Sequence, residues 1–266
     1  MSRLFIPKAI TKTILSVAKA NVADIIGGRN PVIEALKSGR PLNKILLARN
    51  IRQHSTVAEI LHLSQARGIP IEYVTRDVID RLSTTAVHQG VIAYVASKKY
   101  VTLADLLAIS KERNEPPLYC LLDGIEDPHN LGAIIRTADA SGVHGVIVPS
   151  RRAAGLTAGV AKASAGAVEY VPVARVSNLS QTIETLKKSN VWVIGIDPAG
   201  KSDYTKVDFS LPTAIIIGSE GKGLSHLVKK RCDYLASIPM RGKITSLNAS
   251  IAAALVMYEA FRQRNR

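Results

Sequence analysis

Five polar residues in the second half of the chain lie next to apolar segments. Three follow such a segment, and two precede the final apolar segment. Asn130 and Arg136 follow one apolar segment, Glu220 stands in a glycine-rich loop after another, and Ser246 and Asn248 precede the final apolar run. A guanidinium binds phosphate through its planar fork of donors and can stabilise a developing alkoxide. An ion pair with a nearby carboxylate is the plain alternative for Arg136, so the residue alone does not define a site.

The loop Gly218–Ser225 is the obvious candidate for phosphate binding, but its spacing fails both common patterns. A Walker loop has lysine and then serine or threonine directly after its last glycine, whereas Leu224 follows Gly223 here. The GxGxxG pattern of dinucleotide-binding proteins fails because His226 stands where the third glycine belongs. The sequence therefore disfavours an NTPase and an ordinary Rossmann enzyme, although the glycines still allow a ligand close to the backbone.

A third segment brings apolar and polar residues together before the last helix. Ile238 stands at the end of a predicted strand, and the final helix is expected from Leu247 to Arg264. Backbone amides at a helix start bind polar ligands, and a leucine beside them suits a flat apolar ligand such as adenine. Equally, Ser246 could be a helix cap and Leu247 a core residue, so both interpretations stay open at this point.

Taken together, three segments resemble the signature motifs of the SpoU (TrmH-type) RNA ribose 2′-O-methyltransferases, in order and spacing. They are LLDGIEDPHNLGAIIRTADASGVHGVIV, AIIIGSEGKGLS and SIPMRGKITSLNASIAAALVMYEA. The resemblance implies an α/β domain with a parallel sheet and the trefoil knot of the SPOUT superfamily. It also implies S-adenosylmethionine as methyl donor, no metal, and a homodimer formed through this domain.

The resemblance assigns roles to individual residues of this sequence. It implies that the catalytic residues are Asn130, Arg136, Glu220, Ser246 and Asn248. It implies that the methyl donor is held at Gly218, Ile238 and Leu247. The HQG sequence at His88–Gly90 is similar to the RlmB branch, which methylates a guanosine ribose in 23S ribosomal RNA and carries an N-terminal RNA-binding domain like some ribosomal proteins. Ribose methylation of tRNA, and non-catalytic RNA binding or ribosome assembly, remain as alternatives.

Two α/β domains are expected to position these residues. Helix and strand patterns alternate over residues 24–97, which predicts a small module, and again over 118–266, which predicts a parallel sheet covered by helices. Residues 98–117 contain a polar run and a proline pair, which are typical of a linker. Residues 1–23 are a basic extension with no acidic residue.

The charge balance predicts a polyanionic partner, RNA before an anionic membrane surface. The 266 residues carry a formal charge of +14, and no apolar stretch is long enough to span a bilayer. Nine basic residues between Gly221 and Arg266 stand against two acidic ones, Asp233 and Glu259. This asymmetry predicts that RNA docks at the C-terminal end of the second domain, with Lys229 and Lys230 on the contact surface.

Cysteine and histidine usage favours a reducing compartment and no metal site. The two cysteines, Cys120 and Cys232, are too few for a four-ligand zinc cluster, and the six histidines show no ligand spacing. The cytoplasm is the expected location. The basic, acid-free extension also resembles an organellar presequence, which leaves a mitochondrial location as an alternative.

Overall fold

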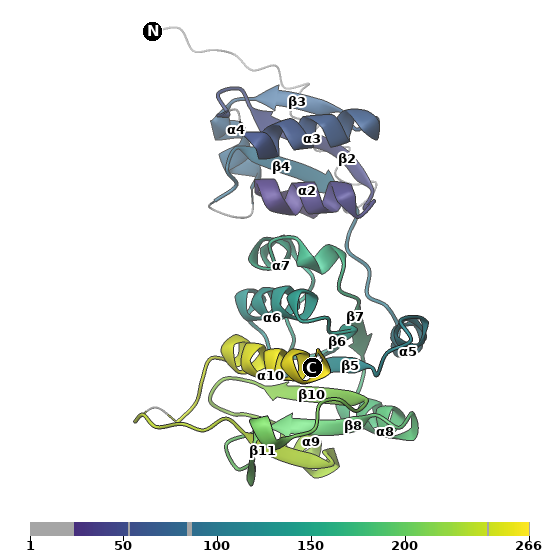
Figure 1. The fold of residues 1–266 in the computed structure, drawn as a ribbon. Helices are drawn as coiled ribbons and strands as arrows, with labels where there is room; N and C mark the ends of the chain where they lie inside the picture. The colour runs from purple at the N-terminus through teal and green to yellow at the C-terminus, as the bar shows by residue number, and fades with distance from the viewer. Residues whose placement is uncertain (1–23, 53, 84–86, 244, 266) are drawn as a thin grey trace, which may run out of the picture. The chain divides into compact units, whose positions relative to one another are not determined.

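The computed structural model describes residues 24–265 apart from 53, 84–86 and 244, and it divides into two compact units between Lys98 and Lys99 (Figure 1). Each unit combines a sheet with helices, which confirms the predicted α/β class. The basic extension over 1–23 and the targeting function considered for it lie outside the described residues. No helix in the described part of the chain has the length and apolar character that a membrane span requires.

The first unit is a four-stranded mixed sheet with the strand order β1-β4-β2-β3. Its strands are β1 (Asp24–Gly27), β2 (Leu42–Ala48), β3 (Ile71–Val74) and β4 (Val91–Val95), and its helices are α2 (Arg29–Lys37), α3 (Ser55–Ala66) and α4 (Arg76–Leu82). β2 and β3 are parallel, whereas β4 runs antiparallel to both β1 and β2. The four-residue strand β1 was not predicted, because so short a segment carries little periodicity.

The HQG sequence forms a tight turn before β4, in which His88 and Gly90 are buried and Gln89 is exposed. His88 is buried, its Nε2 lies 2.5 Å from Asp80 Oδ1, and its Nδ1 accepts a hydrogen bond from Gly90 N at 3.0 Å. The Oε1 atom of Gln89 accepts from Arg29 N at the first residue of α2. The motif therefore joins the start of β4 to the start of α2.

The second unit is a seven-stranded sheet with the order β7-β6-β5-β10-β8-β11-β9, and every pair of neighbours is parallel. The strands are β5 (Leu118–Asp123), β6 (Gly145–Pro149), β7 (Val173–Val176), β8 (Trp192–Ile196), β9 (Ser202–Asp203), β10 (Thr213–Gly218) and β11 (Tyr234–Ser237). The helices are α5 (Leu103–Glu112), α6 (Pro128–Ala140), α7 (Ala158–Ala163), α8 (Leu179–Lys188), α9 (His226–Arg231) and α10 (Ala249–Arg264). The trefoil knot that the resemblance implies stays a prediction.

Helices cover both faces of this sheet (Figure 1). α6 and α10 pack against each other, and α8 packs against α9. Successive residues of a strand point to opposite faces, so Tyr119 and Leu121 join the core that α5, α8 and α9 complete. The intervening residues Cys120 and Leu122 are buried as well. A sheet buried on both faces explains the nearly continuous apolar runs of its strands.

Residues 98–117 do not lie in an open linker between the two units. Most of the segment belongs to the second unit, where α5 packs its fully buried Leu106 into the core of the sheet. Thr102 caps this helix in a capping box with Asp105. The polar residues after α5 conceal this role in the sequence, because only one side of a surface helix needs to be apolar.

Candidate functional site

The neighbouring strands β5, β10 and β8 end at one edge of the parallel sheet. A polar residue lies at or just after the C-terminal end of each strand. β5 ends at Asp123, β10 leads into the loop that contains Glu220, and Asp197 directly follows β8. Asp123 is buried, and its Oδ2 accepts a hydrogen bond from Ser225 N at 2.7 Å. Ligands of open α/β sheets bind at this edge, so the loops that follow these strands are the candidate ligand site.

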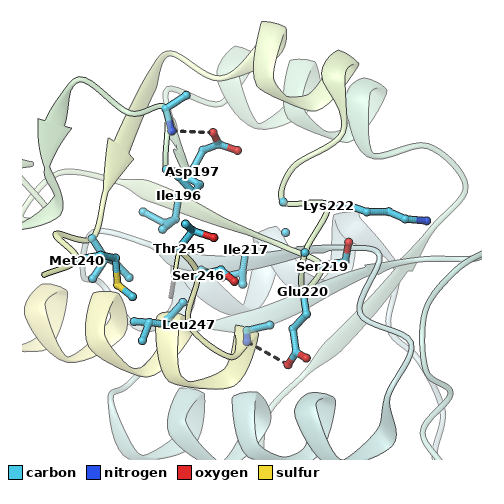
Figure 2. Close-up of a pocket in the computed structure, with 18 of the residues that line it drawn as sticks. Ile196, Asp197, Ile217, Ser219, Glu220, Lys222, Met240, Thr245, Ser246 and Leu247 are labelled. Atoms are coloured by element: carbon cyan, nitrogen blue, oxygen red, sulfur yellow. Dashed lines mark hydrogen bonds between the residues drawn. The ribbon is translucent and has the colours of Figure 1, made fainter. Parts of the chain in front are cut away.

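Asn130, Glu220 and Asn248 form one hydrogen-bonded cluster, although they come from three separate elements. Asn130 Nδ2 donates to Glu220 Oε1 at 3.0 Å, and Asn248 Nδ2 donates to the same oxygen and, at 2.9 Å, to Asn130 Oδ1. Ala249 N also donates to Glu220 Oε1, at 3.4 Å (Figure 2). One carboxylate therefore ties the start of α6 and the start of α10 to the loop after β10.

The start of α10 differs from the sequence-based expectation. The helix begins at Ala249, and its cap is Asn248, whose Oδ1 accepts from Ser250 N and Ile251 N at 2.9 and 3.3 Å. Ser246 therefore does not cap the helix. It lies two residues before the cap and lines a cavity instead. Asn248 holds the helix end with its oxygen and the Glu220 carboxylate with its nitrogen.

A cavity of about 450 Å³ lies beside this cluster, between the loops that follow β8, β10 and β11 (Figure 2). Gly218, Ile238 and Leu247, the three residues expected to hold a methyl donor, all line it, as do Glu220 and Ser246. Its walls are apolar on the sides formed by Ile196, Ile217, Met240 and Leu247 and polar around Asp197, Glu220 and Lys229. A cavity with both apolar and polar walls suits a ligand that combines a flat apolar ring with charged groups.

The glycine loop passes so close to the end of β10 that only a glycine fits at Gly218. A Cβ atom at Gly218 would lie 2.2 Å from the carbonyl carbon of Gly223, which no backbone can accommodate without shifting. Ser219 and Gly223 also form a β-bridge, which closes the loop upon itself. Gly223 has a φ of 63°, a conformation that glycine adopts most readily. The loop therefore folds back over the strand and forms one wall of the cavity.

Arg136 stands apart from the other predicted catalytic residues. It is exposed on α6, and the hydrogen bonds that join Asn130, Glu220 and Asn248 do not include it. Six residues along a helix correspond to a rotation of roughly 240°, so Arg136 and Asn130 project from different sides of α6. Within one chain, the structure brings the amide–carboxylate cluster and the cavity together and leaves Arg136 facing solvent.

Neither Asp197 nor Lys229 was predicted as a cavity residue, although both line the cavity. Lys229 Nζ lies 2.7 Å from Asp197 Oδ2. An acidic residue directly after a buried parallel strand was the signal that could have identified Asp197. The sequence placed Lys229 on an RNA-binding surface, and the structure pairs it with a buried carboxylate; its contact with RNA stays a prediction.

The nine basic residues between Gly221 and Arg266 do not form one open surface. Three of them form ion pairs within the chain: Lys229 with Asp197, Arg231 with Glu184 and Arg262 with Glu259. Arg264 is largely committed to the backbone carbonyls of neighbouring loops, among them that of Leu211. Arg231 and Arg262 are exposed despite their ion pairs, and the other exposed members in the described part of the chain are Lys222, Lys230, Arg241 and Lys243. Lys222 lines the cavity, and Arg241 directly follows the lining residue Met240.

The two cysteines are thiols held in apolar surroundings. Cys120 is buried within β5, and burial raises its pKa. Burial, followed by the charge of Asp233, raises the pKa of Cys232 to about 12. The thiolate is the reactive form, so neither residue is poised to act as a nucleophile near neutral pH.

Comparison with known proteins connects both units to one family. Residues 117–258 match the SpoU rRNA Methylase family, and residues 25–101 match the RNA 2′-O ribose methyltransferase substrate-binding domain. YacO of Bacillus subtilis, named as a member of the TrmH family of tRNA/rRNA methyltransferases, is 50% identical over 91% of this chain and 96% of its own length.

Two solved structures share the fold across both units. The SpoU methyltransferase AviRb from Streptomyces viridochromogenes, in complex with AdoMet, aligns with a TM-score of 0.75 and 30% identity over 91% of this chain and 90% of its own. An AdoMet-bound rRNA methyltransferase from Sinorhizobium meliloti aligns with a TM-score of 0.74 and 26% identity over 98% and 97% of the two chains. With both family matches and these relatives, the chain belongs to the SpoU family of RNA 2′-O-ribose methyltransferases.

Proposed function

We propose that this protein transfers a methyl group from S-adenosylmethionine to the 2′ oxygen of a guanosine ribose in 23S ribosomal RNA. The observation that carries the proposal is the cavity beside the Asn130–Glu220–Asn248 cluster, because it places a ligand pocket next to ordered polar groups. The similarity of both units to the rRNA methyltransferase of Sinorhizobium meliloti supports ribosomal RNA as the target. The HQG turn, with its buried His88, is the feature that favours the RlmB-like branch.

The cavity fits the methyl donor in size and in the distribution of its polar groups. Its volume of about 450 Å³ lies within the range of small-molecule sites, which is roughly 300–1,000 Å³. Gly218, Ile238 and Leu247 would hold the donor, the first through its exposed backbone and the other two through apolar contact. When bound, S-adenosylmethionine supplies the electrophilic sulfonium methyl group.

The residues around the pocket would orient the ribose and stabilise charge. Asn130 and Asn248 hold the Glu220 carboxylate by one oxygen, Oε1, so that its position is fixed relative to the cavity. Ser246 lines the cavity and is placed to hydrogen-bond the reacting ribose. Arg136 would bind a phosphate of the target nucleotide and stabilise the negative charge that develops on the 2′ oxygen as its proton leaves. The bound donor would supply its methyl group to this oxygen, with the carbon–sulfur bond broken and the ribose proton released to solvent.

We assign RNA recognition to residues 24–97 and methyl transfer to 118–266, with 98–117 completing the second unit. The match of the first unit to a substrate-binding domain supports this division. The exposed Lys222, Lys230, Arg241 and Lys243 offer positive charge beside the pocket. Contacts between such residues and phosphates release counterions, so affinity should fall steeply with salt. We place the protein in the cytoplasm, since unpaired buried thiols suit a reducing compartment.

We further propose that two copies associate through α10. One side of this helix packs on α6, whereas Ile251, Leu255, Tyr258 and Phe261 remain exposed on the other. The rings of Tyr258 and Phe261 lie 5.9 Å apart and form the centre of this apolar surface. Contiguous apolar patches on a soluble protein usually mark an interaction site. In a symmetric dimer, each copy could place its Arg136 near the cavity of the other copy.

A methyl-transfer assay with labelled S-adenosylmethionine tests the proposed function. Separated 23S rRNA, 16S rRNA and tRNA from a strain that lacks the gene serve as substrates, and nucleoside mass spectrometry identifies the product. The expected result is 2′-O-methylguanosine in 23S rRNA alone. Methylation of tRNA would replace the substrate in the proposal. No transfer to any RNA, with RNA binding retained, would favour a non-catalytic role.

A further inference from the structure

Asp197 occupies a fixed and almost completely buried position at one wall of the cavity. Only 3% of the residue is exposed. Its backbone N donates to Ala236 O at 2.9 Å, which ties it to β11, and its Oδ1 accepts from Ala199 N at 3.0 Å (Figure 2). The other carboxylate oxygen, Oδ2, is the one that faces Lys229.

Lys229 supplies the positive charge that this buried carboxylate needs. Its Nζ lies 2.7 Å from Asp197 Oδ2, and 34% of its side chain is exposed. A buried charge without a partner is strongly unfavourable, so removal of Lys229 would leave Asp197 uncompensated at the cavity wall. Lys230 differs from Lys229 in two ways: it is exposed, and it does not line the cavity.

The Asp197 carboxylate also limits where the glycine loop can lie. A Cβ atom at Gly223 would be 3.2 Å from Asp197 Oδ2, so the loop passes close to this oxygen. Two residues further on, Ser225 N donates to Asp123 Oδ2 at 2.7 Å. The far end of the loop therefore lies close to carboxylates at the ends of β8 and β5, the two strands that flank β10.

We propose that the Lys229–Asp197 ion pair positions the glycine loop for binding of the methyl donor. Lys229 is then a positioning residue of the donor pocket and not a contact to RNA. The inference rests on the proposed function, since it takes the cavity as the donor site. Lys230 is its matched control, with the same charge, on the same helix and one residue away.

Calorimetric titration of the full chain with S-adenosylhomocysteine separates the two lysines. Lys229→Met should weaken binding by about 10-fold or more, and Lys230→Met should leave it within about twofold, because only the first removes a charge from the pocket wall. Binding of a 23S rRNA fragment, measured without donor at several salt concentrations, should show the reverse order. Donor affinity equal to wild type in Lys229→Met would overturn the inference.

Two further measurements distinguish positioning from a loss of folding. Lys229→Arg keeps the charge and should retain most donor affinity, and the double variant Asp197→Asn/Lys229→Met should recover part of it, because it no longer buries an unpaired charge. Steady-state kinetics of Lys229→Met should show a raised KM for the donor with kcat within about threefold of wild type. No recovery in either variant would contradict the proposed pairing. Wild-type protein that binds no S-adenosylhomocysteine would instead refute the proposed function itself.

Discussion

Asn130 and Glu220 are 90 residues apart in the sequence, and a single 3.0 Å hydrogen bond joins them at the edge of the cavity. The bond makes a carboxylate the common acceptor for groups at the starts of two helices, α6 and α10. Its consequence is that the shape of the site depends on the charge of Glu220 as well as on its length.

Glu220→Gln should reduce kcat by about 100-fold, the scale for loss of one preorganised charged group. The amide keeps the size of the side chain and one oxygen that can accept from Asn130 and Asn248, but it removes the negative charge. Donor affinity should remain within about threefold, because the cavity lining is otherwise intact. Single-turnover methyl transfer measures the effect, with Glu112→Gln, the same change at an exposed glutamate on α5, as control. Equal loss in the control would show that the cluster is not responsible.

Arg136→Ala should leave donor binding and folding nearly unchanged while transfer falls by about 100-fold or more. The residue is exposed, so its truncation should alter the free energy of unfolding by less than about 0.5 kcal/mol. Arg136→Lys should recover little, since an ammonium cannot form the paired phosphate contact of a guanidinium. Transfer within a few-fold of wild type would remove Arg136 from the catalytic residues.

A protein that begins at Lys99 should fold and bind S-adenosylhomocysteine but lose most of its affinity for RNA. All the residues that line the cavity lie beyond this point, and α5 remains to cover the sheet. A protein that begins at Glu115 should instead be unstable, because it lacks the buried Leu106 and exposes the surface that α5 covers. Thermal unfolding and calorimetry compare the two. Full RNA affinity in the longer piece would leave the first unit without its proposed role.

Leu255→Glu should convert a dimer to a monomer, because a carboxylate cannot be desolvated in the centre of an apolar interface without a partner. Light scattering after gel filtration measures the mass at several concentrations. Leu227→Glu is the matched control, since Leu227 is also exposed but lies on α9, away from the proposed interface. A dimer that survives Leu255→Glu, or is lost in the control, would place the interface elsewhere.

Stability should decrease as pH falls from about 6.5 toward 4, in part because of His144. Burial, and then the positive charge of Arg113, lower the pKa of this histidine to about 4, while its Nδ1 accepts from Leu118 N. Between these two values the unfolded chain binds a proton that the folded chain excludes, so the histidine's contribution is complete above 6.5 and lost by about 4. The effect is on the order of 3 kcal/mol. Urea unfolding of wild type and His144→Gln across this range should show a shallower pH slope in the variant.

The sequence was most informative where residue type and spacing are dictated by the backbone. Gly218 is such a case, since any side chain there would strike Gly223, and the three expected donor-binding residues line one cavity. It was least informative where a residue's role depends on a distant partner. In the sequence, Lys229 resembles a surface lysine, and only the fold brings Asp197 close to it. Ser246 resembles a helix cap, but Asn248 is the residue that caps α10.

The same limit explains the segment before β5. A helix on the surface of a sheet shows one apolar side only, and the polar residues that follow α5 suggested a linker although Leu106 is fully buried. Nothing local to residues 98–117 indicates which sheet they cover. Tertiary packing decides it.

The sheet order has a consequence for how the protein is made. β5 is synthesised early in the second unit, yet its neighbour β10 follows only after four other strands of the same sheet, β6, β7, β8 and β9, and the cap of α10 comes later still. Domains tend to fold from the N-terminal side during translation, and pairing between distant strands is slow. The first unit can therefore be complete while the ribosome is still adding the segments that enclose the cavity. A nascent chain would recognise RNA before it could modify it.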